Sequence, residues 1–263
     1  MNVKRITDKI YLSSFLKTNY CLFSYHLGDL DDFYFQYSSY LALINEVTNN
    51  IEEIILIFEK FGIPTVLALG TSQLFESFLE EILDQLPEKF YCHYLLKHEK
   101  IFKKYFDMVD LGLHQKMSFK EKSINEITEN SNIVNLHRIH LVELQNLYQQ
   151  SYPDTYFNEK MLDTGYYYGL LDTNHKIIAV VGIHTYSKEF NMAVIGNITT
   201  HPDHRGKGYG HMLLEKLLFE LSLKVTNISL NVKKNNIQAI SLYEKLGFEH
   251  CVDYKEALFE NFH

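Results

Sequence analysis

The sequence contains no tryptophan, only 4 prolines and 3 cysteines, and no apolar run long enough to cross a membrane. The cysteines, Cys21, Cys92 and Cys251, are odd in number and lack the spacing of a metal site or a redox pair. We therefore expect reduced thiols, as in a cytosolic protein. Residues 1–9 lack the apolar core of a secretory signal, so the expected location is cytoplasmic.

Positive charge is also scarce, with 25 Lys and Arg against 33 Asp and Glu, which gives a formal net charge of −8. This sign argues against nucleic acid or an anionic membrane as a general partner. The 13 histidines form no H-E-x-x-H motif and no cluster with cysteine, so no metal is expected. The remaining composition, 46% hydrophobic and 22% charged, predicts an ordinary globular protein with a sizeable core.

A strand, a glycine-rich turn and a helix follow one another in the C-terminal half. Met192–Thr200 is rich in β-branched residues, Arg205–Gly210 reads R-G-K-G-Y-G, and the leucines after it recur at helical spacing. Glycine lets the backbone approach a ligand closely, and the first turn of a helix offers unpaired N–H groups with partial positive charge. This order predicts a site for a phosphate or pyrophosphate.

Spacing separates this turn from two better-known phosphate motifs. The dinucleotide fingerprint needs G-x-G-x-x-G, and the P-loop needs G-x-x-x-x-G-K-[ST]. Neither fits, because Gly206, Gly208 and Gly210 alternate and His211 follows them. The pattern that fits is R-x-x-G-x-G.

A second motif lies downstream. Ile228–Val232 alternates apolar and polar residues, as on a half-buried strand. Asn236–Phe248 then reads N-x-x-A-I-x-L-Y-x-x-L-G-F, a short helix that ends at Gly247. Asn236 and Tyr243 are about two helical turns apart, so we expect both to face one groove.

The two motifs together resemble those of the GNAT family of acyl-CoA N-acyltransferases, and residues 182–202 look like its FR47-like branch. The resemblance covers roughly the last half of the chain. It implies an α/β (α+β) GNAT fold, with a central mixed, mostly antiparallel sheet, for residues 126–263. It also implies acetyl-CoA or another acyl-CoA as co-substrate, and an amine-bearing small molecule or peptide as acceptor.

Carried over by motif position, the resemblance assigns roles to individual residues. Tyr243 is the general acid for the leaving thiolate. The cofactor-binding residues are Ile198, Thr199, Thr200, Arg205, Gly206, Lys207, Gly208, Tyr209, Gly210, His211 and Asn236.

The general base is less well marked. Many relatives carry a glutamate on the central strand, whereas Met192–Thr200 has no carboxylate. His184 is the candidate proton relay; a histidine on a strand can equally be structural. Glu189 is expected in a solvated turn.

Residues 1–125 predict a smaller α/β domain with alternating helices and strands and no chemical motif. The spacing predicts a helix over Ile51–Phe61, and a helix over Leu136–Tyr148 begins the second domain. The polar stretch 118–132 marks the boundary between domains 1–125 and 126–263. The alternation also permits a hypothesis, that the first domain is a degenerate copy of the same fold.

Two other functions remain open at this point. A non-catalytic acyl-CoA-binding or regulatory module would explain the missing carboxylate. A nucleotide-binding protein would use the glycine turn and leave the Asn236–Phe248 motif without a role. The acceptor, the acyl-chain length and the oligomeric state have no motif in the sequence.

Overall fold

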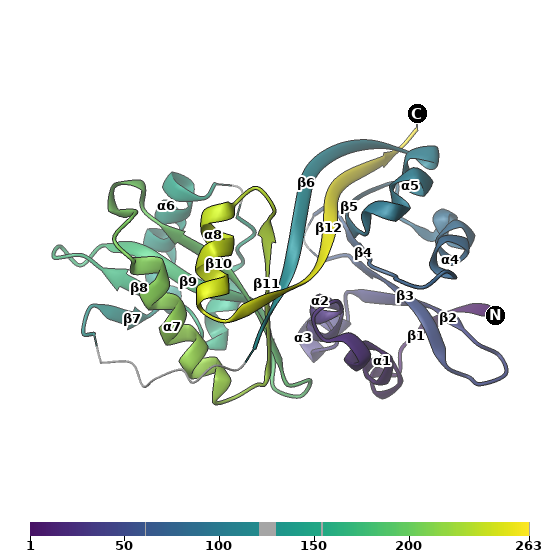
Figure 1. Cartoon of the computed structure of the whole chain (residues 1–263), viewed down its shortest axis with the longest axis horizontal. Coiled ribbons are helices and arrows are strands. Elements are labelled where there is room, and N and C mark those ends of the chain that lie inside the picture. Colours follow the sequence, from purple (N-terminus) through teal and green to yellow (C-terminus); the bar gives the residue numbers. More distant parts are fainter. Residues whose placement is uncertain (61, 121–129, 154, 263) are drawn as a thin grey trace. The chain divides into compact units, whose positions relative to one another are not determined.

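The computed structural model describes residues 1–60, 62–120, 130–153 and 155–262 (Figure 1). Unit 1 comprises Met1–Met117, Val232–Ile237 and His250–His263, and unit 2 comprises Ser118–Asn231 and Gln238–Glu249. The domain boundary predicted near residue 125 lies outside the described residues. Within the described part, every helix is too short or too polar to span a bilayer.

Unit 1 is a mixed sheet with helices. Strands β1 (Asn2–Ile6), β2 (Ser38–Ile44), β3 (Ile51–Phe58) and β4 (Thr65–Ala68) pair antiparallel in chain order. Strand β5 (Lys89–Tyr94) joins β4 in parallel, β12 (Phe248–Asn261) pairs antiparallel with β5, and β6 (Phe106–Phe119) follows β12. Its helices are α1 (Lys9–Leu16), α2 (Ser24–Gly28), α3 (Asp32–Phe35), α4 (Phe75–Glu81) and α5 (Glu99–Tyr105).

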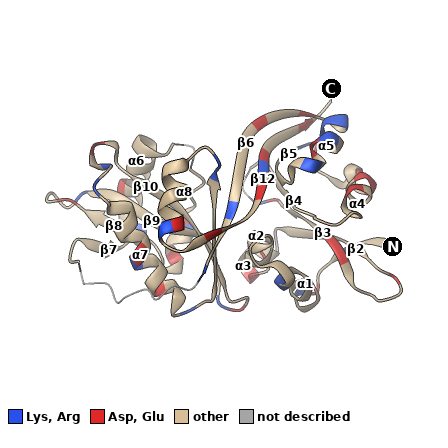
Figure 2. Ribbon diagram, viewed as in Figure 1, with Lys and Arg blue, Asp and Glu red and all other residues tan. Residues whose placement is uncertain are grey.

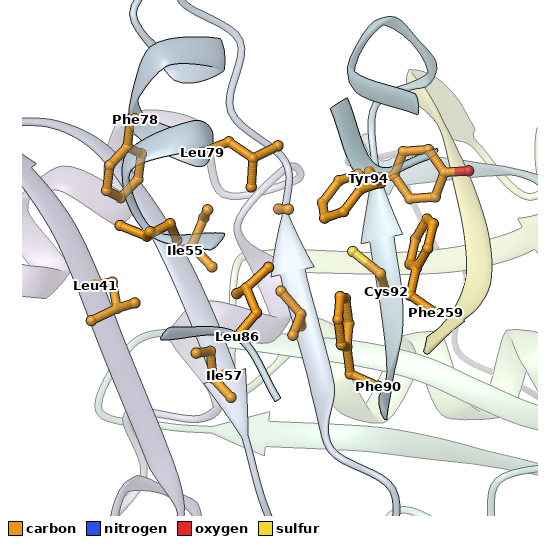
Figure 3. Packing of buried hydrophobic residues seen from close by; sticks show 14 of the residues in the cluster. Leu41, Ile55, Ile57, Phe78, Leu79, Leu86, Phe90, Cys92, Tyr94 and Phe259 are labelled. Carbon is orange, nitrogen blue, oxygen red and sulfur yellow. The ribbon is translucent and has the colours of Figure 1, made fainter. Parts of the chain in front are cut away.

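The core of unit 1 is built from aliphatic and aromatic side chains on its strands and on α4 and α5 (Figure 3). Phe259 of β12 is fully buried and stacks on Phe102 of α5, with ring centroids 4.8 Å apart. The ring centroid of Phe90 on β5 lies 5.6 Å from that of Phe259. Burial of such a side chain stabilises the fold by about 1.5–3 kcal/mol, so β12 is part of this core.

The predicted helix over Ile51–Phe61 is wrong, because Ile51–Phe58 forms strand β3. This strand lies between β2 and β4, and both of its faces are largely buried. A strand buried on both faces reads as a continuous apolar run, and such a run also contains helical spacings. Pairing with two neighbouring strands satisfies its backbone and decides the outcome.

The strands of unit 2 also pair in a mixed pattern. Strands β7 (Ile133–Asn135), β8 (Tyr168–Leu171), β9 (Ile177–Ser187) and β10 (Met192–Thr200) pair antiparallel in chain order, and β11 (Asn227–Lys233) joins β10 in parallel. Its helices are α6 (Leu141–Ser151), α7 (Tyr209–Ser222) and α8 (Ile237–Lys245). The helix predicted over Leu136–Tyr148 begins later, because the Leu136 amide donates to the Tyr167 carbonyl at 2.8 Å and Arg138–His140 form a 3-10 turn before α6.

The two units repeat one order of elements. In each, antiparallel strands lead to a helix and then to a strand parallel to the one before the helix. The helix is α4 in unit 1 and α7 in unit 2. The expected mixed α/β fold is confirmed, and the repeat supports the hypothesis that the N-terminal half is a second copy of the fold.

The expectation of three reduced thiols is wrong for two of them, because Cys21 and Cys251 form a disulfide with their Cα atoms 6.6 Å apart. The two residues are 230 positions apart in the sequence, so only the fold of unit 1 brings them together. Cys92 is a buried free thiol.

Candidate functional site

The glycine turn in front of α7 is open to solvent. Gly206 and Gly208 have φ angles of 78° and 79°, in the left-handed region that favours glycine. A Cβ at either position would meet no heavy atom within 4 Å, apart from its chain neighbours. The backbone at this turn is therefore exposed to an incoming ligand.

The first turn of α7 supplies donors to this space. The amide of Met212 donates to the Gly208 carbonyl at 3.1 Å, so the preceding amides, from Tyr209 to His211, have no acceptor inside the helix. In the described part of the chain, no side chain caps α7. These amides, the positive end of the helix dipole and the exposed Lys207 together favour an anion.

A free strand edge lies upstream of the turn. Parallel pairing joins Met192–Ile195 of β10 to Asn227–Leu230 of β11. Strand β10 continues to Thr200, so its residues from Gly196 onward extend beyond this register. Apart from the Thr200 carbonyl, which accepts a hydrogen bond from Arg205, the backbone of the predicted residues Ile198, Thr199 and Thr200 on this side can therefore pair with an extended ligand, as a neighbouring strand would.

Two irregularities in the pairing of β9 and β10 shape this edge. The register shifts between Val194 and Ile195, and again between Gly196 and Thr199. Asn197, in the second irregularity, has a left-handed φ of 56°. A bulge of this kind bends a strand and redirects its side chains.

Buried hydrogen bonds hold the bulge in place. The hydroxyl of Tyr148 donates to the main-chain carbonyl of Asn197 at 3.0 Å. The side-chain amide of Asn197 donates to the Tyr167 hydroxyl at 2.8 Å. Thr155 donates to the Asn197 side-chain oxygen at 2.8 Å, and Tyr167 donates to the Ile183 carbonyl at 3.0 Å. Sequence reasoning missed Tyr148, Thr155 and Tyr167. The available signal was the pair Gly196-Asn197 inside a predicted strand, which is typical of a bulge.

His184 lies against this bulge. A Cβ at Gly196 would be only 2.1 Å from His184 Nε2, so the missing side chain makes room for the imidazole. His184 is half-buried and stands where the β9 register shifts, between Thr185 and Ile183. The structure thus places the predicted proton relay beside the strand edge, and its role stays a prediction.

Arg205 binds within the protein rather than pointing freely into the turn. Its Nε donates to the Thr200 carbonyl at 3.1 Å, and its Nη2 donates to the Ser151 carbonyl at 3.1 Å. The guanidinium therefore ties the end of β10 to the last residue of α6. Both acceptors are main-chain carbonyls, one of them at a helix C-terminus, where a cation is favoured.

Tyr243 lies on α8 and is buried. Burial raises its pKa above the ordinary value, and the neighbouring Tyr152 adds to this effect. The hydroxyl thus stays protonated at neutral pH, as a proton donor requires. Leu242, the preceding residue, lies 4.0 Å from the Cβ position of Gly210, so α8 packs beside the first turn of α7.

The remaining predicted residues have these positions. Asn236 directly precedes α8, and its amide donates to the Lys233 carbonyl at 2.9 Å. His211 Nδ1 lies 3.1 Å from a Glu215 carboxylate oxygen, one helical turn away. Among the described residues, no group of three or more His, Cys, Asp or Glu side chains is placed to hold a metal ion.

Comparison with known proteins gives one family. Residues 133–248 match the sequence model of the Acetyltransferase (GNAT) family. The ribosomal protein bS18-alanine N-acetyltransferase of Salmonella typhimurium is 46% identical over 60 residues, which make up 22% of this chain and 40% of that protein. The chain thus spans less than half the length of this curated relative.

Solved structures share the fold over nearly the whole chain. A Drosophila protein covers 98% of this chain and 98% of its own length, with a TM-score of 0.70 and 10% identity. A tandem GNAT protein from the clavulanic acid pathway covers 99% of this chain and 98% of its own, with a TM-score of 0.57 and 11% identity. At such identities the likeness shows the fold alone.

Proposed function

Because residues 133–248 match the sequence model of the GNAT acetyltransferase family, we propose that the chain is an acyl-CoA-dependent N-acyltransferase, moving an acetyl group from acetyl-CoA to a primary amine. The observation that carries the proposal is the open glycine turn directly before α7, next to a strand edge that extends beyond its parallel partner. The turn fits a pyrophosphate, and the edge fits the amide groups of a pantetheine arm.

Each part of the site has a task in this reaction. The amides from Tyr209 to His211 hold the pyrophosphate, and the backbone of Ile198–Thr200 orients the arm. The amine nitrogen bonds to the acyl carbon, the carbon–sulfur bond breaks, and Tyr243 gives its proton to the departing thiolate. His184 takes a proton from the amine, directly or through water.

The acceptor is proposed only as a class. The curated relative in Salmonella is named for a protein alanine as its acceptor. We extend to this chain the shared chemistry, a primary amine on a peptide or a small molecule. The expected cytoplasmic location stays a prediction.

One observation favours a second function. Strand β10 carries no carboxylate, and Asn197, a polar residue at its bulge, is engaged in buried hydrogen bonds. A chain that binds acyl-CoA without transferring the acyl group would need no base. Release of free CoA that depends on an added amine separates the two functions, because only a transferase produces it.

Calorimetric titration with acetyl-CoA tests the cofactor site. Gly208→Glu places a side chain and a carboxylate in the open turn, and we expect binding to weaken at least 100-fold, equivalent to about 2.7 kcal/mol. Gly165→Glu is the matched control, because Gly165 has φ 78° and a Cβ there also meets nothing within 4 Å. It shares the backbone strain and the added charge, and should bind as the wild type does. Equal losses in both variants, or no binding by the wild type, would refute the proposal.

A further inference from the structure

We propose that the chain binds one acyl-CoA, in unit 2, and that the corresponding turn of unit 1 is closed by its own side chains. The inference rests on the proposed function and states which of two similarly folded units carries the site. The turn at issue is Leu69–Leu74, between β4 and α4, which corresponds to the turn between β10 and α7.

An aromatic ring fills the space over the unit 1 turn. A Cβ at Gly70 would lie 1.7 Å from a ring carbon of Phe75, the first residue of α4. Phe75 is fully buried. A Cβ at Gly206 or Gly208 of the unit 2 turn would meet no heavy atom within 4 Å, so a pyrophosphate has room at the second turn, whereas Phe75 fills the space over Gly70 at the first.

A carboxylate from the protein already occupies the donors of this turn. The Ser72 amide donates to Glu53 Oε1 at 2.8 Å, and the Leu74 amide donates to the Ser72 hydroxyl at 3.1 Å. Glu53 is only 2% exposed, so its side chain is built into the fold. A phosphate at this turn would have to take the Ser72 amide from the Glu53 carboxylate, and it would then lie close to that like charge.

Further contacts fix the backbone of the turn from the other side. His98 Nε2 lies 2.9 Å from the Gly70 carbonyl oxygen, and Lys97 Nζ donates to the Thr71 carbonyl at 2.8 Å. These two contacts occupy carbonyl groups that a mobile ligand-binding turn would leave to solvent.

Strand pairing gives an independent argument. Strand β4 pairs with β5 along its whole length, from Thr65 with Tyr91 to Ala68 with Tyr94. Strand β10 pairs with β11 only from Met192 to Ile195. The free edge that a pantetheine arm needs is therefore present in unit 2, whereas the same edge in unit 1 is taken by the protein.

Charge points the same way. Helix α4 carries Glu76, Glu80 and Glu81 and no Lys or Arg, and the turn before it has no charged residue (Figure 2). The turn of unit 2 carries Arg205 and Lys207. The one cation at the unit 1 turn that is described above, Lys97, comes from outside the turn and is engaged by the Thr71 carbonyl, whereas Lys207 of the unit 2 turn is exposed.

Native mass spectrometry at an acetyl-CoA concentration about tenfold above the wild-type Kd counts the bound molecules. We expect one per wild-type chain, one per Gly165→Glu chain and none per Gly208→Glu chain. Two per wild-type chain, or one retained by Gly208→Glu, overturns this inference and leaves the proposed function standing. No binding to the wild type overturns the proposed function itself.

Hydrogen–deuterium exchange then locates the molecule. Acetyl-CoA should slow exchange of amides in residues 206–211 and leave residues 70–75 unchanged. Protection of residues 70–75 without protection of 206–211 contradicts the assignment, even if a single molecule binds.

Discussion

Tyr243 is a single hydroxyl on which the proposed chemistry depends. Its burial and raised pKa keep the hydroxyl protonated, as the proposed proton transfer to a thiolate requires. For Tyr243→Phe we expect kcat to fall by about 100-fold, the lower end of what a positioned acid contributes, while the affinity for acetyl-CoA measured by calorimetry stays within about twofold. An unchanged kcat would leave Tyr243 a packing residue against Phe248, whose ring lies 6.0 Å away.

His26 makes a prediction about pH. It is fully buried, and burial, helped by the charge of Lys116, lowers its pKa to about 3. The unfolded chain takes up this proton below pH ~6.5 and the folded chain does not, so His26 costs stability as pH falls, by about 1.4 kcal/mol per pH unit. Asp29 is half-buried, and desolvation raises its pKa to about 8, which acts in the opposite direction, so the comparison must be made between variants.

We therefore expect His26→Leu to gain thermal stability relative to the wild type as pH falls from 6.5 to 4. The exposed His175→Asn serves as control and should follow the wild type across this range, because asparagine also tolerates the left-handed backbone at this position. A His26→Leu curve parallel to the wild-type curve would mean that His26 takes up its proton equally well in the folded and the unfolded chain.

Among single residues, the short motifs predicted the local structure around the candidate site, and the ligand-binding and catalytic roles stay predictions. Gly206, Gly208 and Tyr243 stand in an open turn and on an adjacent helix, as their spacing indicated. The hydrogen bonds from Tyr148, Thr155 and Tyr167 to Asn197 could not be predicted. They join elements far apart in the chain, and only the folded backbone fixes which hydroxyl reaches which acceptor.

Among the elements, the ends of α6 and β10 are joined by one side chain. Arg205 donates to one carbonyl on each. For Arg205→Lys we expect a loss of about 1–2 kcal/mol, since one ammonium cannot reproduce both bonds of the guanidinium fork. A lower thermal midpoint, together with weaker acetyl-CoA binding, is the expected result; a change in binding with no change in midpoint would assign Arg205 to the ligand instead.

The elements also show where reading periodicity fails. Helix α7 was predictable because its apolar residues recur on one side at helical spacing and its polar residues lie on the other. Strand β3 was not, because its apolar residues face both ways and its pairing partners lie elsewhere in the chain. The free edge of β10 likewise depends on where β11 stops pairing, which no local pattern records.

For the molecule as a whole, the disulfide closes almost the entire chain into a loop. Such a long closure, over 230 positions, restricts the unfolded state and is worth about 3–5 kcal/mol. We expect a reducing agent, or the double change Cys21→Ser with Cys251→Ser, to lower the thermal midpoint. The control Cys92→Ala should keep the response to reductant. A thiol titration of the wild-type chain, unfolded without reductant, should find one free thiol, and three free thiols would show that the disulfide does not form.

Strand β12 has a further consequence, for the order in which the chain is made. It supplies Phe259 to the core of unit 1, the unit whose other strands are almost all translated first. A ribosome adds about 5–20 residues per second, so this half emerges early and waits, with a gap in its sheet beside β5, while unit 2 is synthesised. A premature stop codon after residue 249 would thus spare the motifs of the site and leave the first-made half without its last strand.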